Sequence, residues 1–223
     1  MKELKIKVFT FDELPKGIQD TIIERERWNV MDRETEALEY DQTLEEFEKI
    51  TDSRVTCYDT GYCGYRFGRV VSDKLAFGEF DLEDLSGELL FRYIDREIMP
   101  YLIRGKYYST GGRYDENGKH KYKYRHSKII MEGAGGCPLT GVCYDCYILA
   151  PLFDYYYNWA RPEYRNLTFC DVMERCYDSL FKSIHEAYEY YASDEAVREY
   201  LSCRDDYYYE NGTEYNDYVR GVA

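Results

Sequence analysis

The chain has 223 residues and a formal net charge of −14 at pH 7, from 29 basic and 43 acidic side chains. This charge argues against sequence-independent binding of nucleic acid by the molecule as a whole, because each neutralised phosphate needs a lysine or an arginine. No apolar run approaches the roughly 18 residues that a membrane span needs, so we expect no membrane association. The 27 tyrosines outnumber the 16 leucines, and the hydrophobic core is therefore expected to use tyrosine rings.

The first part of the chain predicts a short strand followed by two helices. Residues 4–9 alternate charged and apolar side chains, which is typical of a strand and not of the continuous apolar core of a signal peptide. We therefore expect a cytoplasmic protein. Thr10 and Glu13 have capping-box spacing, and apolar residues repeat at helical spacing from Leu14 to Ile23. A second, very acidic helix is expected over residues 33–50.

The middle of the chain predicts short antiparallel strands and a helix. Residues 54–80 are rich in glycine, tyrosine and β-branched residues, with turns expected at residues 61 and 64. A helix is expected over residues 86–103. The pair Asn117-Gly118 favours a type I′ turn, so we expect the flanking residues to form a hairpin.

Three more helices are expected, over residues 145–160, 168–192 and 194–203. The second carries apolar side chains at three- and four-residue spacing, which predicts one buried face: Met173, Tyr177, Leu180, Ile184, Tyr188 and Tyr191. Asn211-Gly212 predicts a closing hairpin. These elements indicate an α+β fold, with an antiparallel sheet and hairpins packed against several helices, in a single domain over residues 1–223.

The predicted hairpin in the middle of the chain is a candidate binding site. Between Arg104 and Lys128 the local charge is +6, in a protein whose net charge is −14. The candidate binding residues are Arg113, Lys119, Lys121, Lys123 and Arg125. A row of cations beside tyrosines suits nucleic-acid phosphates or an acidic partner. The alternative is that the lysines protect an edge strand from pairing with another chain.

The eight cysteines are expected to be reduced thiols, since a chain of this size does not need disulfides. Cys143 and Cys146 have a spacing at which a turn can direct both sulfurs toward one metal ion. Cys137 is a third candidate ligand, and a fourth would come from a distant cysteine or histidine. This segment makes a zinc site the alternative to our expectation of no cofactor. The chain has no nucleotide-binding loop and no His-Glu-x-x-His motif, and nothing in the sequence supports a catalytic assignment.

The negative charge is concentrated in two segments. Residues 32–48 have a charge of −7, and residues 186–217 have a charge of −8. On one surface, these segments could imitate the phosphates of a nucleic acid or bind a basic groove. The alternative is two solvated helix faces.

Two short blocks resemble a family of small accessory proteins of tailed phages and prophages, for which no biochemical activity is established. The first block is residues 11–22, where Phe-Asp-Glu-Leu precedes a helix that contains Gln19. The second is residues 193–201, followed by residues 207–212. The sequence departs from the family at Pro15, where a serine is usual. The resemblance implies a phage accessory protein and assigns no catalytic residue.

A phage accessory protein without a catalytic signature is expected to act by binding. Our first hypothesis is a non-enzymatic anti-defence inhibitor, anti-CRISPR or anti-restriction, in the cytoplasm of the host cell. It would occupy a host protein or nucleoprotein effector that has a basic surface. The second hypothesis is a nucleic-acid-binding module that uses the basic hairpin at residues 104–128. The third is a small enzyme or zinc protein centred on Cys137–Cys146.

Overall fold

The fold is taken from a computed structural model, which describes residues 6–36, 38, 40–102, 107–108, 125–126, 138–140 and 144–215. The chain divides into two compact units. The terminal unit comprises Met1–Leu38 and His185–Ala223, and the central unit comprises Glu39–Ile184. The predicted α+β class is confirmed, with antiparallel strand pairs and helices that pack against them. That residues 1–223 form one domain stays a prediction.

The terminal unit is built from both ends of the chain. Its elements are β1 (Phe9–Thr10), the 3-10 helix η1 (Phe11–Glu13), α1 (Lys16–Glu36), the end of α7 (Phe169–Tyr191), α8 (Asp194–Ser202) and β10 (Tyr207–Tyr208). β1 pairs antiparallel with β10, with Phe9 opposite Tyr208. The predicted capping-box contact is present, since the backbone N–H of Thr10 donates to Glu13 Oε2 at 2.9 Å. It precedes η1, and α1 begins only after Pro15.

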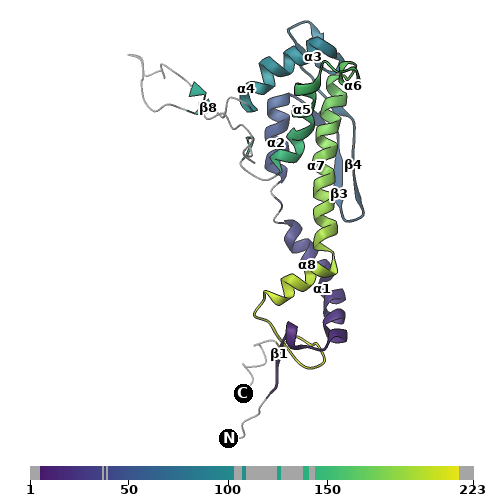
Figure 1. The fold of residues 1–223 in the computed structure, drawn as a ribbon, viewed down its shortest axis with the longest axis vertical. Coiled ribbons are helices and arrows are strands. Elements are labelled where there is room, and N and C mark those ends of the chain that lie inside the picture. The colour runs from purple at the N-terminus through teal and green to yellow at the C-terminus, as the bar shows by residue number, and fades with distance from the viewer. Residues whose placement is uncertain are drawn as a thin grey trace, which may run out of the picture. The chain divides into compact units, whose positions relative to one another are not determined.

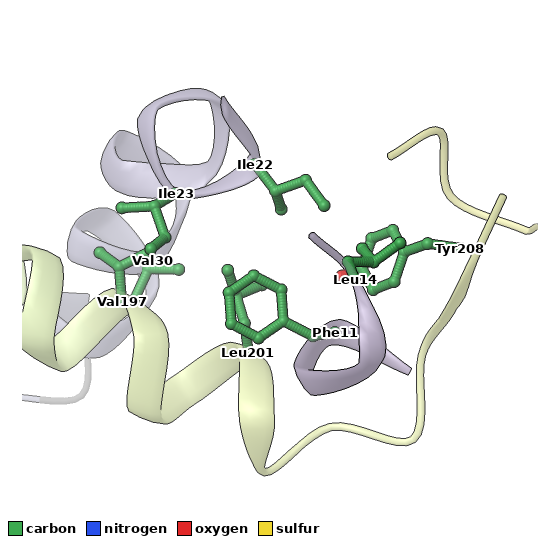
Figure 2. Close-up of a cluster of buried hydrophobic side chains, with 8 residues drawn as sticks. All are labelled: Phe11, Leu14, Ile22, Ile23, Val30, Val197, Leu201 and Tyr208. Atoms are coloured by element: carbon green, nitrogen blue, oxygen red, sulfur yellow. The ribbon is translucent and has the colours of Figure 1, made fainter. Parts of the chain in front are cut away.

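One cluster of buried side chains forms the core of this unit (Figure 2). It contains Phe11, Leu14, Ile22, Ile23, Val30, Val197, Leu201 and Tyr208. Figure 2 shows Val197 and Leu201 of α8 directed toward side chains from η1 and α1. Burial of these apolar side chains removes them from water and stabilises the joining of the two chain ends.

The central unit contains the other helices and most of the described strands. Its elements are α2 (Tyr40–Thr51), β2 (Arg54–Val55), β3 (Tyr58–Gly61), β4 (Gly64–Phe67), β5 (Val70–Val71), β6 (Leu75–Ala76), β7 (Phe80–Asp81), η2 (Leu82–Asp84), α3 (Gly87–Tyr93), the π-helical η3 (Ile94–Ile98), α4 (Met99–Leu102), β8 (Tyr107–Tyr108), β9 (Arg125–His126), α5 (Asp145–Asn158), α6 (Pro162–Arg165) and the larger part of α7.

The strands over residues 54–71 form one long hairpin in a single antiparallel register. Arg54 lies opposite Val71, Tyr58 opposite Phe67, and Gly61 opposite Gly64. The predicted turn is therefore confirmed. The ring of Tyr58 stacks on Phe181 of α7 with centroids 5.1 Å apart, and Figure 1 shows β3 and β4 running along that helix.

The helices predicted over residues 145–160, 168–192 and 194–203 are present as α5, α7 and α8, whereas α6 and the extension of α1 to Glu36 were not predicted. α3, η3 and α4 follow one another without interruption over Gly87–Leu102, within the predicted helix. The predicted acidic helix over residues 33–50 is wrong as a single element, because α1 extends to Glu36 and α2 begins at Tyr40. On α7, the predicted face is fully buried from Met173 to Ile184, whereas Tyr188 and Tyr191 are half-buried.

Two parts of the predicted middle hairpin are described. β8 pairs antiparallel with β9, with Tyr107 opposite His126 and Tyr108 opposite Arg125. The two arms of the hairpin therefore meet as predicted, and the turn at Asn117-Gly118 lies outside the described residues. In the part of the chain that the structure describes, no helix combines the length and the apolar composition needed to cross a bilayer.

Candidate functional site

Most of the site residues predicted from the sequence lie outside the described part of the chain. These are Arg113, Lys119, Lys121, Lys123, Cys137 and Cys143. Arg125 lies in β9, opposite Tyr108. Cys146 lies in the first turn of α5 and is exposed. No cluster of three or more potential metal ligands occurs among the residues with described positions. The zinc site therefore stays a prediction.

The acidic segment at residues 32–48 is divided between the two units. Residues up to 38 belong to the terminal unit, as does the described part of the second acidic segment. α2 belongs to the central unit and carries four acids and one lysine: Asp41, Glu45, Glu46, Glu48 and Lys49. The two helices that the segment forms therefore supply acids to two different units.

A broad cleft of about 840 Å³ lies beside α2 in the central unit, and we call it the α2 cleft. Its lining residues are Gln42, Glu45, Glu46, Lys49, Ile50, Asp52, Lys74, Glu97, Tyr101, Pro138, Leu139 and Thr140. The lining carries four carboxylates and two ammonium groups, a net charge of −2. The segments that supply these charges are separated along the chain, and the fold alone brings them together.

Two of the four carboxylates in the α2 cleft are neutralised within the protein. Lys49 Nζ lies 3.1 Å from Glu46 Oε1, and Lys74 forms an ion pair with Asp52. Glu45 and Glu97 form no ion pair with any described residue. These two side chains therefore carry negative charge that is open to a cation from outside the molecule.

Asp52, which forms the ion pair with Lys74, has an unusual backbone conformation. Its φ of 56° lies in the left-handed region, and it directly follows the last residue of α2. Glycine or asparagine is usual at this position. Burial lowers the pKa of Lys74, but the hydrogen bond that Lys74 donates to Asp52, the negative charge of Asp52 and the interaction with Tyr93 together outweigh this effect, and the pKa lies above its ordinary value. Lys74 is thus held as a cation, with its Nζ 5.7 Å from the ring centroid of Tyr93.

The part of the cleft lining at residues 138–140 is fixed by a buried carboxylate. Asp145 has no exposed surface. Its Oδ2 accepts hydrogen bonds from the backbone N–H groups of Leu139, at 2.7 Å, and Thr140, at 2.8 Å. Its Oδ1 accepts from the hydroxyls of Thr43 and Thr140, both at 2.8 Å. Residues 138–140 are therefore tied to both α2 and α5. The sequence showed Asp145 only as one acid among many, so this role was missed.

Tyr177 shows how a tyrosine serves the core of the central unit. Its hydroxyl lies 2.9 Å from Ser53 Oγ, which lies 2.7 Å from Thr51 Oγ1. All three side chains are buried, and burial raises the pKa of Tyr177. A neutral phenol in this setting is a structural group. With Tyr93 and Tyr155 it confirms the prediction that tyrosines fill the core.

Comparison of the chain with family models, with curated proteins and with solved structures finds no match. The resemblance to phage accessory proteins therefore stays a prediction. Its two blocks nevertheless meet in space, because residues 11–22 and 193–201 contribute most of the core of the terminal unit (Figure 2). The apolar residues of these blocks that lie in this core are packing residues.

Proposed function

We propose that this protein acts by binding, and that its α2 cleft receives a basic surface of a partner protein. The observation that carries the proposal is the pair of carboxylates at Glu45 and Glu97, which no described side chain neutralises. The resemblance to phage accessory proteins favours a host immune effector as the partner. The proposal is therefore an anti-defence inhibitor that occupies a CRISPR or restriction complex.

The composition of the cleft lining supports a cationic partner. Charged and polar groups dominate it, and its apolar contribution comes from Ile50, Tyr101, Pro138 and Leu139. Lysine and arginine side chains can place their alkyl stems on such apolar patches while their charges meet the carboxylates. Opposite charges across an interface also accelerate association and exclude wrong partners.

The spacing of the acids on α2 suggests how the protein would inhibit its target. Asp41, Glu45 and Glu48 are four and three residues apart, so they lie along one face of the helix. Successive charges are then separated by about 4.5 to 6 Å along the axis. Such a row of negative charges resembles a nucleic-acid backbone and would compete for a groove that binds one.

The proposal is tested by capture from a lysate of the host with two matched double variants. Glu45→Gln with Glu97→Gln removes the unneutralised charges of the cleft. Glu79→Gln with Glu88→Gln removes two exposed charges elsewhere in the same unit. We expect the wild type and the control variant to capture the same nucleic-acid-binding protein and to displace its nucleic acid, and the cleft variant to do neither.

Two results would overturn the proposal. Equal capture by both variants would show that the cleft is not the binding surface. Direct binding of labelled DNA or RNA, lost on changing Lys119, Lys121 and Lys123 to glutamate, would favour the basic hairpin at residues 104–128 instead.

A further inference from the structure

A second, smaller groove lies in the terminal unit, between α1, the end of α7 and α8. Its volume is about 150 Å³, which corresponds to about five water molecules in the liquid. Val30 and Ala196 line it and are buried. Three phenol rings also line it, from Tyr190, Tyr191 and Tyr200. We call this the tyrosine groove, and its size suits one side chain.

Two carboxylates complete the tyrosine groove. Glu34 comes from α1 and Glu199 from α8, and both line the groove. Neither forms an ion pair with a described residue. A groove that combines two unneutralised carboxylates with aromatic rings is complementary to a cation with a flat, polarisable face.

Two arginines of the chain itself already contact one of the tyrosine rings that line the groove. Arg33 Nη1 donates to the hydroxyl of Tyr200 at 2.7 Å, and its guanidinium carbon lies 5.8 Å from that ring centroid. The guanidinium carbon of Arg204 lies 5.4 Å from the same centroid. Tyr200 is therefore engaged by the protein's own arginines.

The two tyrosines at the end of α7, Tyr190 and Tyr191, are the rings of the groove that a bound group would contact. Tyr190 is 50% exposed. Its ring meets that of Tyr191 edge to face, with centroids 5.3 Å apart. Half of the Tyr190 side chain is therefore open to solvent, and a planar group can stack on a phenol ring that is accessible in this way.

We propose that the tyrosine groove binds an arginine side chain of a partner protein. A guanidinium group is planar, so it can stack on a phenol ring while it donates in a fork to a carboxylate. An ammonium group offers only a point charge, and a neutral group lacks the charge attraction to Glu34 and Glu199. The apolar side chains of Val30 and Ala196 suit the alkyl stem of the guest.

The source of this arginine rests on the proposed function, because a basic partner would supply it. The groove itself is tested without that partner. The two sites lie in different units, so variants of one leave the other intact. Loss of partner capture in the α2 cleft variant and loss of arginine binding in a groove variant are therefore separate results.

The experiment is an NMR titration of the full chain with labelled tyrosine rings. The probes are N-acetyl-arginine amide, the lysine analogue, and the citrulline analogue, which keeps the shape of arginine without its charge. We expect saturable shifts of Tyr190 and Tyr191 signals with the arginine probe and weaker binding of the lysine probe. The citrulline probe should produce no saturable shift.

Two pairs of variants locate the binding. Glu34→Gln with Glu199→Gln should weaken binding of the arginine probe by about tenfold or more. The matched variant Glu36→Gln with Glu210→Gln changes two exposed acids of the same unit outside the groove, and should bind normally. Tyr190→Phe should retain binding, and Tyr190→Ala should lose it. Equal shifts with citrulline, or unchanged affinity in the Glu34 and Glu199 variant, would overturn the proposal.

Discussion

Arg198 donates a hydrogen bond from Nη1 to Oε1 of Gln19 at 2.7 Å, across 179 residues of sequence. The amide of Gln19 also donates to the carbonyls of Phe11, at 3.2 Å, and Leu14, at 3.0 Å. The Gln19 side chain thus forms hydrogen bonds both with the turn before α1 and with α8. This contact joins residues from the two ends of the chain within one compact unit.

We expect Gln19 and Arg198 to stabilise the terminal unit jointly. Gln19→Ala leaves carbonyls without their donor and should lower the free energy of unfolding by about 1 to 2 kcal/mol. The double variant, Gln19→Ala with Arg198→Ala, should lose less free energy of unfolding than the sum of the two single variants. The difference, which is the coupling energy, should be about 1 kcal/mol. Urea unfolding of the four proteins measures this. If the two single losses added to the loss in the double variant within about 0.3 kcal/mol, the two side chains would not stabilise the unit jointly.

Gly212 is expected to be required in the closing hairpin. Its φ of +81° disfavours any side chain, and a Cβ atom there would lie 2.7 Å from Ile18 Cγ2. Gly212→Ala should therefore destabilise the protein by more than about 1 kcal/mol. Gly17, in the first turn of α1, has open space around its Cβ position, so Gly17→Ala should be neutral or stabilising. Thermal unfolding distinguishes the two, and equal midpoints would contradict this.

Asp145 is expected to hold the wall of the α2 cleft. Asp145→Asn replaces an acceptor by a donor where hydroxyls and backbone N–H groups converge, and should cost about 3 kcal/mol of stability. Thr43→Val removes one donor and should cost about 1 kcal/mol. The exposed Asp84→Asn serves as the control, with a change below about 0.5 kcal/mol. A stable Asp145→Asn variant would show that the carboxylate does not anchor residues 138–140.

The cysteines are expected to differ in their reactivity toward iodoacetamide. Burial raises the pKa of Cys170 to about 11, so little thiolate is present at pH 8 and its alkylation should be slow. The rate should rise as the pH approaches 11. Cys176 is fully buried and should react only after unfolding, whereas exposed Cys57 should react before Cys170 and Cys176. Peptide mass spectrometry follows each site, and rapid alkylation of Cys176 in the folded protein would contradict the fold.

The same labelling tests the predicted zinc site. Cys146 is exposed, so in a metal-free protein it should react about as fast as Cys57. Protection of Cys146 that disappears on adding a chelator would instead support zinc bound by Cys137, Cys143 and Cys146.

Local patterns in the sequence predicted much of the fold. The 3.6-residue spacing on α7 identified the buried face from Met173 to Ile184. Asn211-Gly212 identified the closing hairpin, in which Tyr208 lies antiparallel to Glu214 and the N–H of Tyr209 donates to the carbonyl of Thr213. Such signals lie within a few neighbouring residues. The break between α1 and α2 was missed because the acidic run continues through it without a glycine or proline. The sequence alone could not distinguish the acids that lie on a solvated helix face from those that line the α2 cleft.

The candidate site could not be predicted for a related reason. Glu45, Lys74, Glu97 and Leu139 come from four separate segments, and only the packing of those segments makes them neighbours. Asp145 was likewise indistinguishable from the other acids in the sequence, because its hydrogen-bond donors come from residues that only the fold brings close to it. Charge counted along the chain therefore led to the hypothesis of a basic partner, but not to the surface that we propose receives it.

The most direct measurement of the central claim is the salt dependence of affinity for the captured partner. We expect the wild type to bind more weakly as salt rises. The Glu45→Gln with Glu97→Gln variant should bind at least about tenfold more weakly at low salt, with a shallower dependence, and the Glu79→Gln with Glu88→Gln control should follow the wild type. An affinity that salt does not change, or that is the same in all three proteins, would contradict binding through the acidic α2 cleft.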